Sequence, residues 1–260
     1  MSLSPVDGLD ERRSERRATY ENAPWDSARF IVPLLREAIT AAIRDLPAVP
    51  GEAMKAIDLG CGSQPFRHHL ENAGYSYIGV DAVQNGRDSV DFLAFLDRPL
   101  PPDLLAVGPV DVILCTEVLE HVADWHQAFR NIRCMLRPGG KVVITCPFIY
   151  PLHEQPHDYW RPTGSALRYF AACYGLKIIR QEQLGDFWDA LGTVIGSLGL
   201  DGFARRANGG IALTRRNLGL LAVKLARRAC LAVIPSGPVR KLLPLRSPFY
   251  ISNLVIMGRQ

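Results

Sequence analysis

Short apolar runs that end in a polar or acidic residue recur along the first part of the chain. They are rich in β-branched residues and bounded by glycine, proline or charged positions, which is typical of buried strands. Between them, apolar residues recur three and four positions apart, which predicts helices. The alternation predicts an α/β fold with a mostly parallel, doubly wound sheet. The first four predicted strands are Ala56–Leu59, Tyr77–Asp81, Val110–Glu117 and Lys141–Pro147.

Two later runs extend this sheet, and three helices have recognisable starts. Leu176–Gln183 and Phe249–Gly258 are predicted strands. Helical spacing over Asp26–Leu46 predicts a leading helix closed by prolines. Asp124 and Thr163 are suitable N-caps for two further helices, because their side-chain oxygens can accept from a first-turn amide.

The most informative turn is Gly60-Cys61-Gly62, which follows the acid Asp58 at the end of the first predicted strand. Glycines allow a ligand to approach the main chain closely. A dinucleotide is one candidate, but its fingerprint needs a third small residue where this chain has Pro65, and Asp58 would repel a diphosphate. A cationic ligand without phosphates fits better. Asp81 ends the second strand about 20 residues later, the spacing at which an acid reaches ribose hydroxyls.

Four motifs in order resemble those of class I S-adenosylmethionine-dependent methyltransferases, most of all the broad type 11-like branch. The resemblance covers about residues 54–183 and the last strand. It implies a Rossmann-like seven-stranded sheet, mostly parallel with an antiparallel last strand, and S-adenosylmethionine as the cofactor. The motifs are Asp58-Leu59-Gly60-Cys61-Gly62, Gly79-Val80-Asp81, Cys115-Thr116-Glu117-Val118-Leu119-Glu120-His121-Val122 and Leu136-Arg137-Pro138-Gly139-Gly140.

The resemblance also implies which positions bind the cofactor. The turn would approach its ribose and amino-acid portion, Asp58 its ammonium and Asp81 its ribose; for both acids, solvation at a strand end is the alternative. Asp91 and Phe92 match only loosely the positions that contact adenine. His121 follows the third strand and would contact cofactor or acceptor, or simply pack. The predicted cofactor-binding residues are Asp58, Gly60, Cys61, Gly62, Asp81, Asp91, Phe92, Thr116, Glu117 and His121.

The loop 147–162 is dense in prolines, aromatics and ionisable groups, and it follows the carboxyl end of a core strand, where open α/β sheets bind ligands. Methyl transfer needs a base only if the acceptor loses a proton, and histidine titrates near neutrality. His157, His153 and Tyr159 are therefore the candidate catalytic residues. The alternative is a rigid lid without catalytic groups. The spacing of the histidines fits no closed metal site, so no metal is predicted.

Composition bounds the remaining choices. A formal charge of +4 over 260 residues argues only weakly for a polyanionic partner. Six cysteines without a Cys-x-x-Cys pair predict a reducing, cytoplasmic compartment. No signal peptide and no run long enough to span a bilayer are evident. The aromatic clamp motif of nucleic-acid base methyltransferases is missing, so no nucleic-acid partner is predicted.

The chain is predicted to comprise four parts. Residues 1–24 form a charged arm, 25–184 the cofactor-binding core, 185–248 a basic helical insertion and 249–260 the final core strand. Within the insertion, Leu218–Ile234 places leucines and alanines on one face and Lys224, Arg227 and Arg228 on the other. Such a helix contacts an anionic membrane or packs on its own domain or a partner. The sequence leaves this choice and the oligomeric state open.

The function predicted from these features is transfer of a methyl group to a small-molecule or lipid-linked acceptor, at oxygen, by direct displacement. The location would be cytoplasmic, with peripheral contact at the inner face of the membrane if the insertion binds lipid. Two alternatives stay open: an NAD(P)-dependent oxidoreductase, and a non-catalytic protein that uses the fold for binding. The leading helix, with Tyr20 and Trp25 before it, would either cover the cofactor site, as in the resembling family, or pack on the surface.

Overall fold

The computed structural model describes residues 27–46, 53–198, 215–234, 237–242 and 248–260. The predicted arm at 1–24, with Tyr20, and Trp25 after it lie outside these residues. The strands are β1 (Met54–Leu59), β2 (Tyr75–Asp81), β3 (Phe92–Leu93), β4 (Val110–Thr116), β5 (Leu136–Pro147), β6 (Leu176–Leu184) and β7 (Ser252–Arg259). The helices are α2 (Ala28–Arg44), α3 (Arg67–Asn72), α4 (Pro102–Ala106), η1 (Leu119–His121), α5 (Trp125–Met135), α6 (Gly164–Cys173), α7 (Phe187–Gly196), α8 (Arg215–Val233) and α9 (Gly237–Leu242).

The strands form one seven-stranded sheet in the order β3-β2-β1-β4-β5-β7-β6. β7 runs antiparallel to both of its neighbours, and the pairs from β3 to β5 are parallel. The predicted fold class is therefore confirmed, including the antiparallel last strand. The chain reverses its direction of winding between β1 and β4, so the carboxyl ends of these strands open into a crevice.

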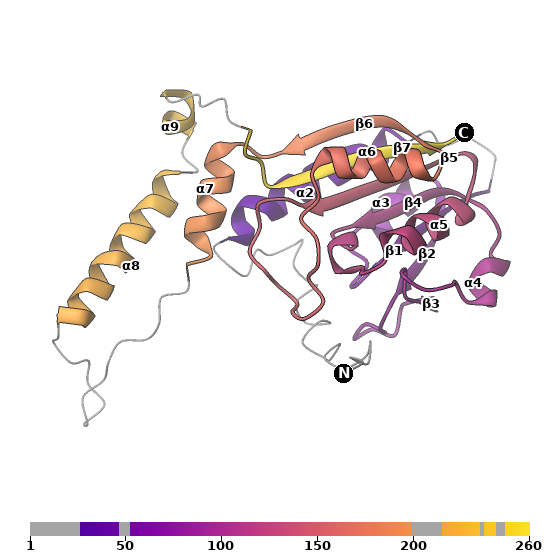
Figure 1. Ribbon diagram of the computed structural model, residues 1–260, viewed down its shortest axis with the longest axis horizontal. Coiled ribbons are helices and arrows are strands. Elements are labelled where there is room, and N and C mark those ends of the chain that lie inside the picture. The colour runs from indigo at the N-terminus through magenta and orange to yellow at the C-terminus, as the bar shows by residue number, and fades with distance from the viewer. Residues whose placement is uncertain (1–26, 47–52, 199–214, 235–236, 243–247) are drawn as a thin grey trace, which may run out of the picture.

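Helices cover both faces of the sheet (Figure 1). α5 and α6 pack one face through a buried cluster that includes Phe129, Ile132 and Leu167. α2 and α3 pack the other face, where Ile39 and Leu70 are buried. α2 buries one side of its surface, which fits the spacing that predicted it. Asp124 and Thr163 accept hydrogen bonds from first-turn amides of α5 and α6, as their N-cap positions predict.

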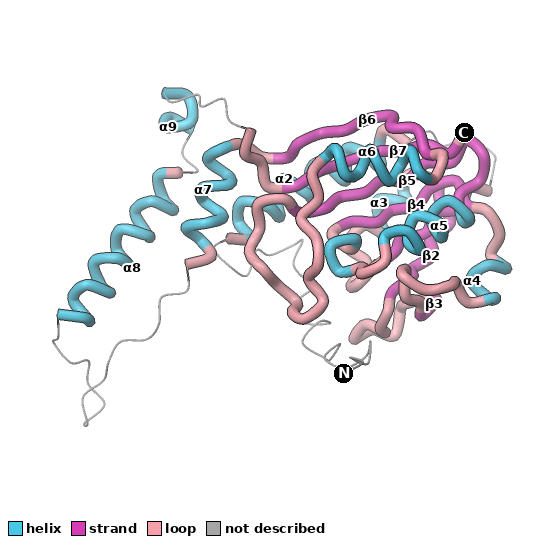
Figure 2. The backbone as a smooth tube through the Cα atoms, viewed as in Figure 1, coloured by secondary structure: helices cyan, strands magenta, loops and turns pink. Residues whose placement is uncertain are grey.

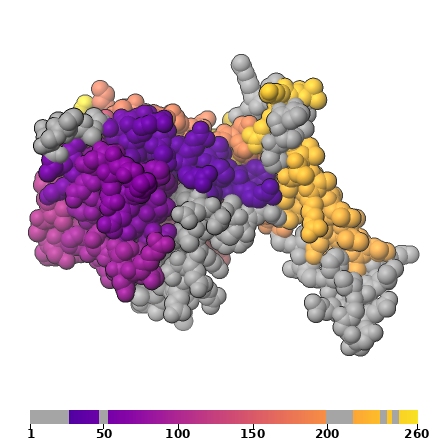
Figure 3. Space-filling view, turned by 180° about the vertical axis from the view of Figure 1, so that it is seen from behind, coloured from indigo at the N-terminus to yellow at the C-terminus, as the bar shows by residue number. Residues whose placement is uncertain are grey.

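The segment between β6 and β7 contains the three helices α7, α8 and α9. α7 begins at a capping box, in which the carboxylates of Asp186 and Asp189 each accept a hydrogen bond from the backbone amide of the other residue. α8 packs beside α7, and the rest of the surface of α8 faces away from the sheet (Figures 1 and 3). The long loop between β5 and α6 projects beyond the sheet's carboxyl edge (Figure 2).

We predict that Gly192→Ala destabilises the protein by about 1–3 kcal/mol, because over-packing forces its neighbours to move. Gly192 lies in α7 against α2, and an added Cβ would come within 2.4 Å of the Phe30 ring. Gly219→Ala in α8 is the matched control, since its Cβ would meet no atom within 4 Å. Urea-induced unfolding should give a lower midpoint for the first variant only. Equal midpoints would contradict this packing.

Candidate active site

Two cavities lie at the carboxyl edge of the sheet and share Gly60 and His121 in their walls. The larger measures about 580 Å³ and extends from the end of β1 to α2, the loop after β5 and the end of α7. The smaller measures about 280 Å³ and lies between the ends of β1 and β2, the segment after β3 and the segment after β4. A ligand passing over Gly60 can therefore occupy both.

The turn after β1 has a conformation that requires glycine. Gly60 has a φ of +70° and Gly62 one of +50°. A Cβ on Gly60 would lie 2.3 Å from a methyl group of Val118. The amides of Gly60 and Cys61 both donate to the carbonyl of Val80, at 2.7 and 3.1 Å. The turn is thus fixed against β2, with its glycines lining the cavity as the sequence predicts.

Asp81 closes the other side of this turn. Its carboxylate is 2 % exposed and accepts from the amide of Gly62 at 2.9 Å and from that of Val83 at 3.3 Å. Asp81 lines the smaller cavity. A buried carboxylate that backbone amides already orient can accept hydrogen bonds from the hydroxyls of a ligand without having to reorganise.

Asp58 faces the larger cavity and is also only 2 % exposed. The hydroxyl of Tyr77 donates to it at 2.9 Å. Burial raises the pKa of Asp58 to about 7, against the opposing effect of that hydrogen bond, and nearby Asp81 adds to the rise. No Lys or Arg among the described residues lines the larger cavity. A ligand ammonium would therefore be a favourable partner for this carboxylate.

Asp91 and Phe92 do not line either cavity, so the structure does not place them as adenine contacts. The carboxylate of Asp91 accepts from the amide of Gly79 at 2.7 Å, which stabilises the edge of β2. The segment 94–98, immediately after β3, lines the smaller cavity instead. This segment carries no sequence motif. Its place at the cavity can be recognised only from the structure, in which it follows the two-residue strand β3.

Glu117 directly follows β4 and lines the larger cavity. Its φ of +53° is unusual for a residue with a Cβ, and such strain concentrates where a side chain must be aimed. Burial raises the pKa of Glu117 to about 7, although hydrogen bonds involving Thr145 and Ser252 oppose the rise. Thr116 lines the same cavity. The predicted positions 116 and 117 are therefore at the site.

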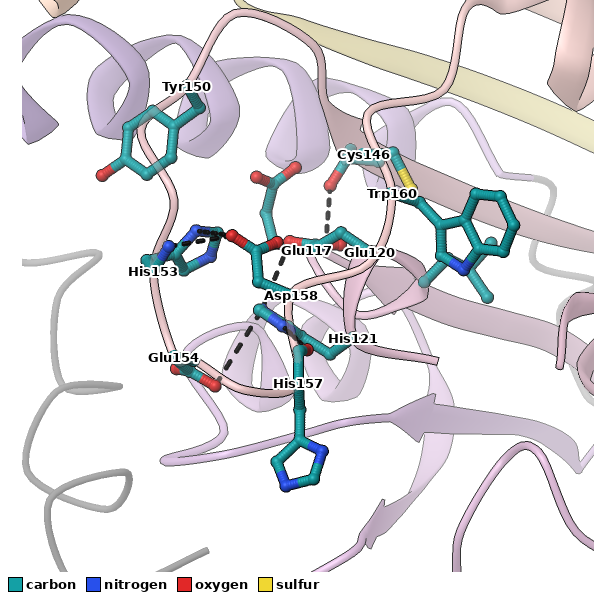
Figure 4. A network of polar contacts seen from close by, with 12 residues as sticks. Glu117, Glu120, His121, Cys146, Tyr150, His153, Glu154, His157, Asp158 and Trp160 are labelled. Carbon is teal, nitrogen blue, oxygen red and sulfur yellow. Dashed lines mark hydrogen bonds and ion pairs between the residues drawn. The ribbon is translucent and has the colours of Figure 1, made fainter. Parts of the chain in front are cut away.

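His121 stands between the two cavities. Its Nδ1 lies 2.8 Å from the carbonyl oxygen of His157, which can only accept, so Nδ1 carries the proton. Its Nε2 lies 3.7 Å from Glu120 and 3.9 Å from Glu154 (Figure 4). This position at the junction fits contact with either a cofactor or an acceptor.

His153 lines the larger cavity and is supported by a fixed ion pair. Arg161 holds both oxygens of Asp158, at 2.6 and 2.7 Å. Asp158 accepts from the amide of His153 at 2.8 Å and lies 3.4 Å from its Nδ1. Burial lowers the pKa of His153, and the charge of Asp158 only partly offsets this. The imidazole is therefore neutral near pH 7.

His157 and Tyr159 lie on the other side of the loop. The ring of His157 points away from Glu117, Glu120 and His153 in Figure 4. Both residues line the smaller cavity, and the Tyr159 hydroxyl is 3.0 Å from the His157 Nδ1. The Nε2 of His157 is buried and has no hydrogen-bond partner among the described residues. These placements favour a cofactor contact over the predicted catalytic role.

Glu120 is fully buried, and neither carboxylate oxygen has a hydrogen-bond partner among the described residues. Burial raises the pKa of Glu120 well above its usual value, and the nearby Glu117 adds to the rise. Atoms of Glu120, His121 and His153 lie within 4.8 Å of one another. The three side chains therefore converge, whereas ligands of a tetrahedral site with bonds of about 2.1 Å lie roughly 3.4 Å apart. The absence of a resident metal stays a prediction.

A methyltransferase domain family matches residues 33–193, more than half of the chain. The chain belongs to this family. The enzyme is thus an S-adenosylmethionine-dependent methyltransferase, as the ordered motifs predict. The match begins within α2 and ends within α7, so it contains every residue assigned above to the two cavities except those at the start of α2 and the end of α7.

Curated relatives are ubiquinone biosynthesis O-methyltransferases. That of Caulobacter vibrioides is 32 % identical over 164 residues, which is 55 % of this chain and 65 % of the relative. The human mitochondrial protein is 28 % identical over 127 residues, 44 % of this chain and 34 % of the relative. The matches thus span between one third and two thirds of these relatives' own length.

Two solved structures share the fold over most of the chain. One is a putative methyltransferase in complex with the Haloferax volcanii Trm112 activator, with a TM-score of 0.52, 16 % identity and 99 % coverage of both chains. The other is the 1,6-didemethyltoxoflavin-N1-methyltransferase of Burkholderia thailandensis, solved with S-adenosylhomocysteine bound. Its TM-score is 0.52 at 13 % identity, with coverage of 100 % of this chain and 92 % of that chain. At these identities the likeness shows the fold alone.

The residues present fit S-adenosylmethionine. Asp58 offers a buried carboxylate for its ammonium, Asp81 one for its ribose diol, and the glycine turn offers close approach to the backbone. The orphaned Nε2 of His157 supplies a further polar contact on the Asp81 side.

We predict that affinity for S-adenosylhomocysteine rises as the pH increases through about 7, because ionised Asp58 binds the ligand ammonium and protonated Asp58 does not. Asp58→Asn should lower affinity at higher pH by about 10- to 100-fold, the value of a hydrogen bond to a charged group, and flatten the pH dependence. Titration calorimetry across this range measures both. Glu117→Gln is the control, because Glu117 has a similar pKa. If it alone removes the dependence, Asp58 is not the titrating group.

Proposed function

We propose that the enzyme transfers the methyl group to a hydroxyl of a small-molecule or lipid-linked acceptor in the larger cavity. The observation that carries this proposal is the neutral imidazole of His153 facing that cavity, since an oxygen acceptor must lose a proton. The O-methyltransferase names of the curated relatives support oxygen as the target.

The acceptor side of the cavity is largely apolar. α2 contributes aliphatic side chains, and the loop after β5 and the end of α7 complete the wall. Such a surface accommodates an aromatic or aliphatic acceptor body and excludes water around the reacting atoms. The apolar residues on this side are Ile31, Val32, Leu35, Leu152 and Leu198. The alternative role predicted for the leading helix, surface packing alone, is incomplete, because α2 also lines the site.

Each end of the site has a separate task. When bound, S-adenosylmethionine supplies an electrophilic methyl group on a sulfonium. We propose that Asp58 binds the ammonium and Asp81 the ribose hydroxyls, so that the reacting end lies near His121 and Glu117. The chain's chief contribution is alignment and exclusion of water, because displacement at an activated carbon needs little covalent assistance.

His153 would accept the proton from the acceptor hydroxyl. Its Nδ1 lies 3.2 Å from the carbonyl oxygen of Pro151, which favours a proton on Nδ1 and a lone pair on Nε2. Asp158, fixed by Arg161, then stabilises the imidazolium that forms. The arrangement positions a base and offsets its charge without an additional ion.

The proposed location is the cytoplasm. The six cysteines form no disulfide, which fits a reducing compartment. Among the described residues, no helix is long and apolar enough to cross a bilayer.

We predict that His153→Ala lowers kcat by about 10²- to 10⁴-fold, as expected for loss of a general base, with little change in cofactor affinity. His157→Ala should instead raise KM for S-adenosylmethionine and leave kcat nearly unchanged, because it lines the smaller cavity. Steady-state kinetics with both substrates varied separates the two effects. A large fall in kcat for His157→Ala alone would return the catalytic role to that residue.

The reaction itself is tested by incubating the protein with S-adenosylmethionine carrying a labelled methyl group and a cell extract that includes its lipids. Mass spectrometry should find the label in an organic acceptor as a methyl ether. Label on nitrogen or carbon would contradict the choice of oxygen. Binding of S-adenosylhomocysteine without any transfer would favour the non-catalytic alternative.

A further inference from the structure

α8 exposes an apolar face along most of its length. Leu218 and Leu225 are 53 % and 56 % exposed, and Leu221, Val223 and Val233 are about half exposed. At 3.6 residues per turn, the intervening positions on this side are also small or apolar. They are Gly219, Ala222, Ala226, Ala229, Cys230 and Ala232.

The opposite face of α8 packs on the protein, and this face carries basic residues. Asn217, Leu231 and Ile234 are buried. Arg227 donates to the carbonyl oxygens of Ile195 and Gly196 in the last turn of α7. The leucines and Arg227 lie on different faces, as the sequence predicts. The leucines face outward, and Arg227 lies toward α7.

The basic charge of α8 indicates whether an anionic membrane or a second copy of the chain covers this apolar face. The 19 residues of α8 include five basic side chains and no acidic one. Arg228, at the border of the apolar face, is exposed, and α9 adds the exposed pair Lys241 and Leu242. Two copies joined through this face would bring the exposed Arg228 side chains together with no acidic side chain of α8 to pair with them. Anionic lipid headgroups would instead neutralise them while the leucines enter the acyl region.

The last turn of α7, which α8 contacts through Arg227, also forms part of the wall of the larger cavity. Gly196, Ser197 and Leu198 line that cavity and follow directly from the turn of α7 that Arg227 holds. Leu198 and Val194 are half exposed beside α8. A lipid-linked acceptor would thus reach the cavity from the surface that α8 contacts; this step rests on the proposed function, whereas the charge argument does not.

We propose that α8 is a membrane-docking helix, which lies in the interface of an anionic bilayer with Leu218, Leu221 and Leu225 inserted. The helix binds along the surface and does not span it. Docking places the cavity wall at the end of α7 next to the bilayer, where an amphiphilic acceptor is concentrated.

Co-sedimentation of the full chain with vesicles of equal parts phosphatidylcholine and phosphatidylglycerol tests this proposal. The protein should bind these vesicles, bind phosphatidylcholine vesicles far less, and dissociate as salt is raised. Leu218→Glu combined with Leu225→Glu should weaken binding by at least about tenfold, from the burial value of a leucine. Leu105→Glu in α4, a leucine of similar exposure on another surface, is the matched control and should bind as wild type.

S-adenosylhomocysteine binding is measured in the same preparations and should be unchanged in all variants, which separates loss of docking from loss of fold or of the proposed function. Light scattering after size-exclusion chromatography reports the oligomeric state. A wild-type dimer that the double substitution converts to a monomer, without vesicle binding, would assign the face to a second copy and overturn the proposal. Vesicle binding that the double substitution leaves intact would also overturn it.

Discussion

The structure depends on two carboxylates buried at neighbouring strand ends. Asp58 and Asp81 are both 2 % exposed, and the charge of Asp81 contributes to the raised pKa of Asp58. Backbone amides donate to Asp81, whereas among the described residues only the Tyr77 hydroxyl donates to Asp58. Raising its pKa from 3.8 to about 7 means that ionising Asp58 costs about 4 kcal/mol more here than in water. We propose that the ammonium of the bound cofactor offsets that cost.

The remaining geometry follows from holding such a ligand above the glycine turn. Val118 and Val80 fix the turn from two sides, and His121 marks the point where the two cavities meet. The loop after β5 is tied down nearby, because the amides of Tyr159 and Trp160 both donate to the carbonyl of Glu120. In the loop fixed in this way, His153 lines the larger cavity and His157 the smaller one.

The sequence was informative where the chemistry is local. The glycine turn, Asp58 and Asp81 could be placed because a strand end and its following turn carry their own signature, and four such motifs in order defined the sheet. Asp91 could not be placed, because its role depends on the register between β2 and the two-residue β3. His153 and His157 could not be distinguished, because four residues of irregular loop decide which cavity each faces. α8 showed its two faces clearly, but only the carbonyls of α7 determine which face is covered.

The central claim is that this strand-end site binds S-adenosylmethionine and its product through Asp58, Asp81 and the glycine turn. Titration calorimetry of the native protein with S-adenosylhomocysteine, with NAD as the comparison ligand, tests it most directly. The account predicts one site per chain for S-adenosylhomocysteine and no heat with NAD. A folded protein that binds NAD, or that gives no heat with S-adenosylhomocysteine, would contradict it.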